Sequence, residues 1–339
     1  MWTTRSATAQ ASGSWAEPLS ELHRFLFEGL PVRGVAVRLT ESWREVLRRR
    51  ADGAAGAWPQ PVRQLLGEMA AASMLMQSNI KFNGALVLQM MGDGPVKVAV
   101  AESQPDLGFR CTAKVVGDVA PGSGLPALVN AGGHGRCAIT LDPQDRLPGQ
   151  QPYQGVVSLV DADSASFGAL AGVLEHYMLQ SEQLDTRLVL AASDEVAAGL
   201  LIQRVPGEGG TQGAVSTGAD ALEDFNRIAI LAASLTAREL LELPTLEVLH
   251  RLFWEEKLLR HEPQTGVSGP RFACTCSRAR VAGMIRSLGA DEAQGILAEQ
   301  GQIEVGCDFC GQQYRFDAVD AAAVFAAPGA NPPASPTVQ

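Results

Sequence analysis

The sequence predicts an α+β fold: an N-terminal domain dominated by antiparallel sheet with packed helices, a helical linker, and a small C-terminal domain built on four cysteines. Three observations support this prediction. Paired apolar runs separated by turn residues recur through residues 19–235. A helical pattern with one apolar face follows Thr236, and four of the six cysteines form two close pairs near the C-terminus.

The composition is that of a globular protein with more than one core. The chain has 339 residues, 46% of them hydrophobic and 19% charged, and its formal net charge of −10 disfavours nucleic-acid phosphates as partners. No apolar run reaches the ~18 residues of a membrane helix. Residues 1–18 lack the apolar segment of a signal peptide and are expected to be a disordered leader. Six cysteines are too few for a disulfide scaffold, so we expect a cytoplasmic protein.

Residues 19–235 are expected to form the N-terminal domain. Ser42 and Glu45 match a capping box that opens a helix. Gly92–Pro95 is predicted to be the turn of a hairpin rather than a phosphate-binding loop. The other expected elements are a strand at 33–39, a helix at 60–77, the hairpin strands 85–91 and 96–102, the strands 187–193 and 198–205, and loops at 120–155 and 206–218.

Residues 236–270 are expected to form the helical linker. Thr236 and Glu239 match a second capping box, and the segment GVSGP at 266–270 ends the linker. Its helical stretch carries apolar residues that we expect on one face, which the N-terminal sheet would cover. These residues are Leu246, Leu249, Leu252 and Phe253. Residues 271–319 then form the cysteine domain, and residues 320–339 a disordered tail.

The cysteine pairs have the spacing of a zinc site with four thiolate ligands. Cys274 and Cys276 form a CxC pair, and 30 residues further on Cys307 and Cys310 form a CxxC pair. We expect two helices separated by a break at Gly289 within 277–300, and strands at 302–305 and 312–316 that form a hairpin around the second pair. One Zn²⁺ per chain follows. Four thiolates leave no open position for a catalytic water, so zinc hydrolysis is not expected.

Other interpretations of the cysteines remain open. A thioredoxin-like CxxC needs a helix after the motif, and Gly311–Tyr314 does not begin one convincingly. A static zinc ribbon that binds nucleic acid is the main alternative, supported by Arg271, Arg278, Arg280 and Arg286 near the cysteines. A small domain held by metal would instead unfold when oxidation converts its thiolates to disulfides, which makes the site a switch.

Several remaining signals have ordinary structural interpretations. Cys111 and Cys137 lack paired spacing and are expected to be plain thiols. The methionines Met74, Met76, Met90 and Met91 are more consistent with core than with a binding surface. His134 lies in a glycine-rich turn, and no nucleophile elbow, P-loop or dinucleotide motif is present, so we do not expect an enzyme.

Over about residues 20–318 the chain resembles the Hsp33 family of redox-regulated chaperones. The C-terminal CxC and CxxC pairs carry the resemblance together with N-terminal segments. These segments are Arg24–Phe27, Pro31–Gly34, Gln77–Phe82, Gly84–Pro95, Tyr177–Gln183, Gly199–Gln203 and Pro206–Gly207.

The resemblance implies an ATP-independent stress-response chaperone rather than an enzyme. Family members bind zinc and are inactive when reduced; oxidants, particularly with heat, form disulfides, release zinc and unfold the zinc domain and linker. The exposed surface then holds unfolding proteins until ATP-dependent chaperones refold them, and oxidised members form homodimers. By matching positions, the metal and redox roles fall on Cys274, Cys276, Cys307 and Cys310, with the CxxC pair sensing oxidant and heat.

Overall fold

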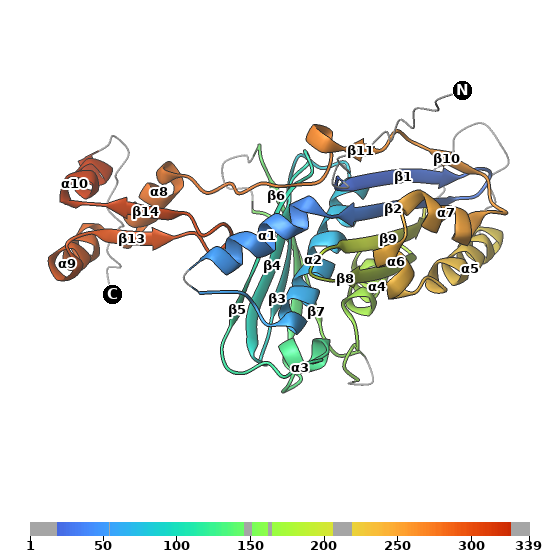
Figure 1. The fold of residues 1–339 in the computed structure, drawn as a ribbon, viewed down its shortest axis with the longest axis horizontal. Helices are drawn as coiled ribbons and strands as arrows, with labels where there is room; N and C mark the ends of the chain where they lie inside the picture. Colours follow the sequence, from blue (N-terminus) through green and yellow to red (C-terminus); the bar gives the residue numbers. More distant parts are fainter. Residues whose placement is uncertain (1–18, 54, 146–150, 162–164, 206–218, 327–339) are drawn as a thin grey trace, which may run out of the picture.

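The computed structural model describes residues 19–53, 55–145, 151–161, 165–205 and 219–326 (Figure 1). The expected leader at 1–18 and loop at 206–218 lie outside these ranges. Within them, the strands form two six-stranded sheets and one two-stranded sheet. The confirmed fold class is α+β with antiparallel sheets, because every pairing between strands is antiparallel except one, between β12 and β5.

The first large sheet has the order β10-β1-β2-β9-β8, with β11 also paired to β1. Its strands are β1 (Glu21–Phe27), β2 (Val32–Leu39), β8 (Thr186–Ala192), β9 (Ala197–Arg204), β10 (Leu258–Arg260) and β11 (Gln264–Thr265). The predicted strands at 33–39, 187–193 and 198–205 are therefore confirmed, and the last two are paired with each other.

The second large sheet has the order β12-β5-β4-β3-β6-β7. Its strands are β3 (Gly84–Met91), β4 (Val96–Ser103), β5 (Gly108–Val115), β6 (Arg136–Pro143), β7 (Tyr153–Ser158) and β12 (Arg271–Phe272). β3 and β4 form the predicted hairpin, with the turn at residues 92–95. The expected loop at 120–155 is wrong in part, since it contains α3 (Leu125–Val129), β6 and the start of β7.

Helix α2 (Gln60–Asn79) lies between the two sheets and confirms the predicted helix at 60–77. It is rich in Ala, Leu and Met on all sides, which is the pattern of a helix buried all round. Its residues Leu66, Met69 and Met74 are fully buried in a core shared with both sheets. Helix α4 (Leu170–Ser181) packs against β8 and β7 and closes one side of this layer.

Three helices cover the outer face of the first sheet: α5 (Ala219–Ala233), α6 (Ala237–Glu242) and α7 (Thr245–Phe253). The predicted capping box at Thr236 is confirmed, because Thr236 Oγ1 accepts from the Glu239 backbone N–H at 3.2 Å and Glu239 Oε2 accepts from the Thr236 N–H at 3.1 Å. Leu249 and Phe253 are buried against the sheet, as expected. Leu246 is 48% exposed, so its predicted place on the buried face is wrong, and Val248 occupies that face instead.

The predicted capping box at Ser42 is wrong. Helix α1 (Glu41–Asp52) has Thr40 as its N-cap, and Ser42 lies inside its first turn. The Ser42 hydroxyl is buried at 2.7 Å from the hydroxyl of Ser20, which holds it away from the helix end. Glu45 forms ion pairs with Arg48 and Arg49 further along the helix instead of reaching back to its N-terminus.

The second half of the expected helical linker is mostly not α-helical: β10 and β11 extend the first sheet along β1, and a short 3-10 helix, η1 (Gly266–Ser268), follows. The small C-terminal domain contains α8 (Arg278–Leu288), α9 (Ala290–Gln300), β13 (Ile303–Gly306), β14 (Gln313–Phe316) and α10 (Ala318–Ala326). The two helices separated at Gly289 and the following hairpin match the prediction. Residues 320–326, expected in the disordered tail, are helical in α10 because Ala321 and Val324 pack into this domain.

Candidate metal centre

Two separate segments bring the four cysteines together. Cys274 and Cys276 lie in the extended stretch between β12 and α8, and Ser277 caps α8 by accepting from the Arg280 N–H. Cys307 and Cys310 lie in the turn between β13 and β14. This turn is closed by hydrogen bonds from Gly311 N to Cys307 O at 2.8 Å and from Cys307 N to Gln312 O at 2.9 Å. Gly311 has φ +74°, a conformation that favours glycine.

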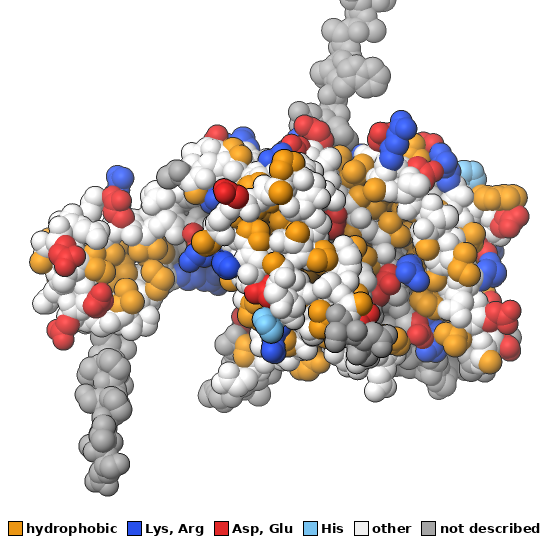
Figure 2. All heavy atoms as spheres, turned by 90° about the horizontal axis from the view of Figure 1, so that it is seen from below, with side chains coloured by type: hydrophobic (Ala, Val, Ile, Leu, Met, Phe, Trp, Pro, Cys, Tyr) orange, Lys and Arg blue, Asp and Glu red, His pale blue; other side chains and the backbone are white. Residues whose placement is uncertain are grey.

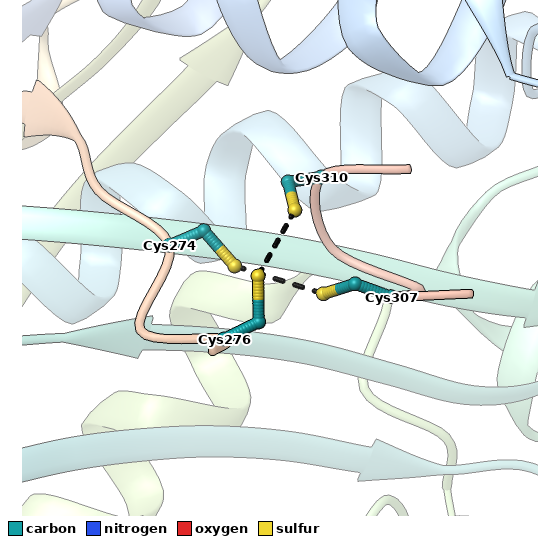
Figure 3. A group of neighbouring side chains, drawn as sticks. All are labelled: Cys274, Cys276, Cys307 and Cys310. Atoms are coloured by element: carbon teal, nitrogen blue, oxygen red, sulfur yellow. Dashed lines mark hydrogen bonds between the residues drawn. The ribbon is translucent and has the colours of Figure 1, made fainter. Parts of the chain in front are cut away.

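The four sulfur atoms point toward one another (Figure 3). All of them lie within 4.8 Å of one another. Two of the contacts join the two segments, at 3.6 Å between Cys274 and Cys307 and 3.4 Å between Cys276 and Cys310. Zn–S bonds of about 2.3 Å in a tetrahedron place sulfur atoms about 3.8 Å apart. The four thiols therefore fit a tetrahedral metal ion such as Zn²⁺.

Local groups set unequal proton affinities within the cluster. Burial acts to raise the pKa of Cys276, but hydrogen bonds from the Tyr314 hydroxyl and the neighbouring thiols lower that pKa to about 7. Burial raises the pKa values of Cys307 and Cys310, and hydrogen bonds with the neighbouring cysteines raise the pKa of Cys310 further because they hold its proton. A divalent cation would replace these protons and stabilise all four thiolates.

The cysteine segments dock on the second large sheet through β5. The Arg110 guanidinium lies over the Phe309 ring, 4.2 Å from its centroid, and its Nη1 is 3.8 Å from Cys274 Sγ. The Thr112 hydroxyl donates to the carbonyl of Asp308 at 2.8 Å. Figure 2 shows the small domain as a lobe apart from the main body, with basic side chains gathered in the recess between them.

The other cysteines do not join this cluster. Cys111 and Cys137 are fully buried in the core between the sheets, where burial raises the pKa of each thiol to about 12. This supports their interpretation as plain thiols. Met74, Met76 and Met90 are likewise core residues, whereas Met91 is exposed.

Two residues that contact the cluster were not identified from the sequence. Tyr314 lies on β14, four residues after the CxxC pair. Its position on a predicted strand that leaves the cysteine turn is the one sequence signal that could have identified it. Arg110 lies 164 residues before Cys274, and no local pattern connects the two.

The four arginines near the cysteines contact groups of the protein itself. Arg271 pairs with Asp106, Arg278 pairs with Asp320 at 2.7 Å, Arg280 donates to the Thr275 hydroxyl, and Arg286 donates to the Val324 carbonyl. These contacts disfavour the alternative of a nucleic-acid-binding face. None of the helices in the described ranges has the length and apolar character needed to cross a membrane.

The glycine-rich turn around His134 also has a structural role. Asp93, in the β3–β4 turn, accepts hydrogen bonds from the backbone N–H groups of Gly132 and His134. These bonds, led by the one from His134, lower the pKa of Asp93 although desolvation acts in the opposite direction.

Comparisons with known proteins agree with this architecture. The family model described as Hsp33 protein matches residues 20–317. A 33 kDa chaperonin of Chromobacterium violaceum is 46% identical over 306 residues, covering 90% of this chain and 93% of that protein. A 33 kDa chaperonin of Methylobacillus flagellatus is 42% identical over 307 residues, covering 90% and 94%.

A solved structure shows the same fold. The crystal structure of the 33 kDa chaperonin of Thermotoga maritima aligns with a TM-score of 0.68 at 21% identity, covering 90% of this chain and 97% of that one. The family match over most of the chain and the curated relatives above 40% identity are decisive. This chain belongs to the Hsp33 family of chaperones.

Proposed function

We propose that this protein is a redox-regulated, ATP-independent holding chaperone that binds one Zn²⁺ through Cys274, Cys276, Cys307 and Cys310 and is inactive in that state. The observation that carries the proposal is the convergence of four thiols from two segments, with every sulfur atom within 4.8 Å of the others. A site with four thiolate ligands is closed, so the metal supplies structural stability there rather than catalysis.

The small domain depends on this metal because its own core is slight. Its buried apolar residues are Val281, Ile285, Ala293, Ile303, Phe316, Ala321 and Val324. Binding of zinc to small thiolate sites supplies about 10–16 kcal/mol at neutral pH. Loss of the metal therefore removes the main source of stability for residues 273–326.

Oxidation removes the ligands. Two molecules of hydrogen peroxide oxidise the four cysteine thiolates to two disulfides; the peroxide oxygens take four protons from the solvent and leave as four water molecules, and Zn²⁺ is released. We propose that the disulfides form within the pairs, between Cys274 and Cys276 and between Cys307 and Cys310. All four sulfur atoms lie within 4.8 Å of one another, so the partners of each local disulfide are already close in the folded domain.

Activation exposes a surface for unfolding proteins. Helices α5, α6 and α7 bury an apolar face against the first sheet, and the chain that follows them leads directly into the cysteine domain. We propose that unfolding of that domain spreads through β12, β11 and β10 to these helices, and that both the helix faces and the sheet then become available to clients. We further propose that the protein acts in the cytoplasm, dimerises when oxidised and passes clients to ATP-dependent chaperones.

The test measures metal content and holding activity in the same samples. Reduced protein should contain one zinc per chain and fail to suppress aggregation of a heat-denatured client, whereas treatment with peroxide at elevated temperature should release zinc and give suppression that reducing agent and zinc reverse. The double variant with Cys111→Ala and Cys137→Ala is the control and should behave as wild type, since both thiols lie outside the cluster. Release of zinc without holding activity would instead establish a static structural site.

A further inference from the structure

A cavity of about 80 Å³ lies between the two large sheets, where α2 ends and α4 closes the open side. Most of its wall is apolar, with Met76, Leu86, Ile139 and Leu201 among the lining residues. Five of the segments that carry the resemblance to Hsp33 contribute to it: Pro31–Gly34, Gln77–Phe82, Gly84–Pro95, Tyr177–Gln183 and Gly199–Gln203. The proposed metal switch gives none of these segments a role.

Arg33 places a positive charge on the wall of this cavity. On β2, the residues that face the layer between the sheets alternate, and Val35 and Val37 belong to the apolar core. Arg33 is the next residue on the same face. Burial lowers the pKa of its guanidinium, and no carboxylate of the described residues forms an ion pair with it. Partial burial of a charged side chain without a counter-ion lowers the stability of the fold. The presence of Arg33 on an apolar wall therefore indicates a function.

The hydrogen bonds of Arg33 leave part of its guanidinium available. Its Nε and Nη2 both donate to the Oε1 atom of Gln203, at 3.1 and 2.5 Å. Gln203 is only 1% exposed, and it is fixed by accepting from Asn79 Nδ2 at 3.0 Å and donating to Thr186 Oγ1 at 2.9 Å. Its oxygen therefore already accepts from two side chains. The other N–H groups of Arg33 have no partner among the residues that the structure describes.

We propose that this cavity binds a small aliphatic carboxylate, with its apolar chain among the lining residues and its carboxylate on Arg33. A guanidinium fork and a carboxylate match in charge and geometry. The cavity has room for about six water-sized groups, which is the size of a short alkyl chain. Glu182 also lines the cavity, and its carboxylate accepts hydrogen bonds from Tyr177 at 2.9 Å and Tyr153 at 3.4 Å, which stabilise its negative charge. The carboxylate of the ligand therefore belongs on Arg33, whose guanidinium can donate to it.

The test compares ligands that share a chain and differ in charge. Hexanoate, hexan-1-ol and hexylammonium are titrated into the reduced full-length protein in about 0.15 M salt, where distant charges are screened. Binding is followed by calorimetry and by NMR shifts of the methyl groups of Met76 and Leu201. Hexanoate should bind roughly tenfold or more tightly than hexan-1-ol, since hydrogen bonds to charged groups contribute that much, and hexylammonium should bind least.

Two variants, with one control, distinguish the contribution of the Arg33 charge from that of the cavity volume. Arg33→Met should weaken hexanoate binding roughly tenfold or more and leave hexan-1-ol binding unchanged. Arg24→Met is the matched control, because Arg24 is another half-buried arginine of the same sheet that lies outside the cavity wall, and it should retain binding. Leu184→Trp fills the cavity without changing charge and should abolish binding of both hexanoate and hexan-1-ol. Equal binding of hexylammonium and hexanoate, or full hexanoate binding by folded Arg33→Met or Leu184→Trp protein, would overturn the proposal.

Discussion

The side chain of Arg110 links the cysteine cluster to the second sheet. Its Nη2 pairs with Glu102 Oε2 at 2.6 Å, and the two side chains are only 14% and 12% exposed. Although burial opposes it, this pairing and the contact with Cys274 raise the pKa of Arg110. The guanidinium also covers the Phe309 ring, which lies between Cys307 and Cys310. Arg110 therefore contacts both cysteine segments, so separation of those segments must break its contacts.

Glu68 is a second residue whose surroundings matter, because its burial makes the stability of the protein depend on pH. It lies on α2 and lines a cavity of about 200 Å³ together with Leu125 and Leu170. Burial raises the pKa of its carboxyl group to about 7, although a hydrogen bond from Gln64 at 3.2 Å acts in the opposite direction. The folded protein therefore holds a proton on Glu68 over a range of pH in which the unfolded chain, with a pKa near 4.5, has lost it.

We predict that Glu68→Gln stabilises the protein at pH 8. As pH rises from about 4.5 to 7, the unfolded chain ionises Glu68 while the folded protein still holds its proton, so wild-type stability falls through this window. Glutamine does not ionise. The variant should gain about 1–3 kcal/mol in free energy of unfolding at pH 8 and nothing at pH 4.5, measured by urea denaturation at both pH values.

The control for this prediction is Glu45→Gln on α1. Arg48 and then Arg49 lower the pKa of Glu45 through their hydrogen bonds, against the opposing effect of desolvation, so its carboxylate stabilises the fold when ionised. This variant should lose stability at pH 8. A gain for Glu68→Gln that does not depend on pH would rule out ionisation as its cause.

At the scale of elements, the sequence predicted those with a simple periodic pattern and missed those that depend on distant partners. The hairpin of β3 and β4 has apolar strands and a glycine-rich turn, and it was found. β6 was missed because its residues Cys137, Ala138 and Ile139 are buried in succession rather than in alternation. Helix α10 was merged with the Pro- and Ala-rich tail, since only its packing into the small domain distinguishes it.

In the candidate site, too, the sequence predicted the features that follow from local spacing and missed those that depend on distant contacts. Motif spacing alone predicted that the four cysteines meet, because two close pairs and a folded insert leave few other arrangements. The contacts of Tyr314 and Arg110 with the cluster depend on how the hairpin folds and where the small domain docks. The buried face of α7 was predicted except for Leu246, because helical spacing leaves the residues at the edge of an apolar face undetermined.

We predict that Phe253→Ala loosens α7 from the first sheet. Phe253 is 2% exposed and packs edge-on against Phe27, with ring centroids 5.0 Å apart, and against Phe25 at 6.2 Å. Removing a buried phenylalanine ring costs about 3–5 kcal/mol. The reduced, zinc-loaded variant should show faster hydrogen exchange in 245–253 and partial suppression of client aggregation before any oxidant is added. Leu246→Ala, which removes an exposed side chain from the same helix, is the control and should change neither quantity.

At the scale of the whole molecule, the buried apolar residues form three separate clusters. One lies between the two large sheets around α2, the second lies between the first sheet and helices α5 to α7, and the third lies within the small cysteine domain. The third cluster contains no residue from either large sheet. Segments that have separate cores can unfold independently, each with its own free energy of unfolding. Loss of the metal site can therefore unfold the small domain and leave the two large sheets folded.

We therefore predict a graded pattern of hydrogen exchange after oxidation. Exchange in 273–326 should rise most, since this domain loses its metal and has the smallest core. Exchange in 219–265 should also rise, but less, because the apolar contacts of α5 to α7 with the first sheet oppose their release. The strands at 84–103 and 186–204 should remain protected, since the core around α2 contains no metal ligand.

Mass spectrometry of reduced, oxidised and re-reduced protein with zinc measures all three segments in one experiment. The quadruple variant with serine at all four cysteine positions is the control and should show the oxidised pattern without oxidant. Protection of 273–326 in protein that has lost its zinc would show that the domain folds without metal, and the proposed switch would then lack its physical basis.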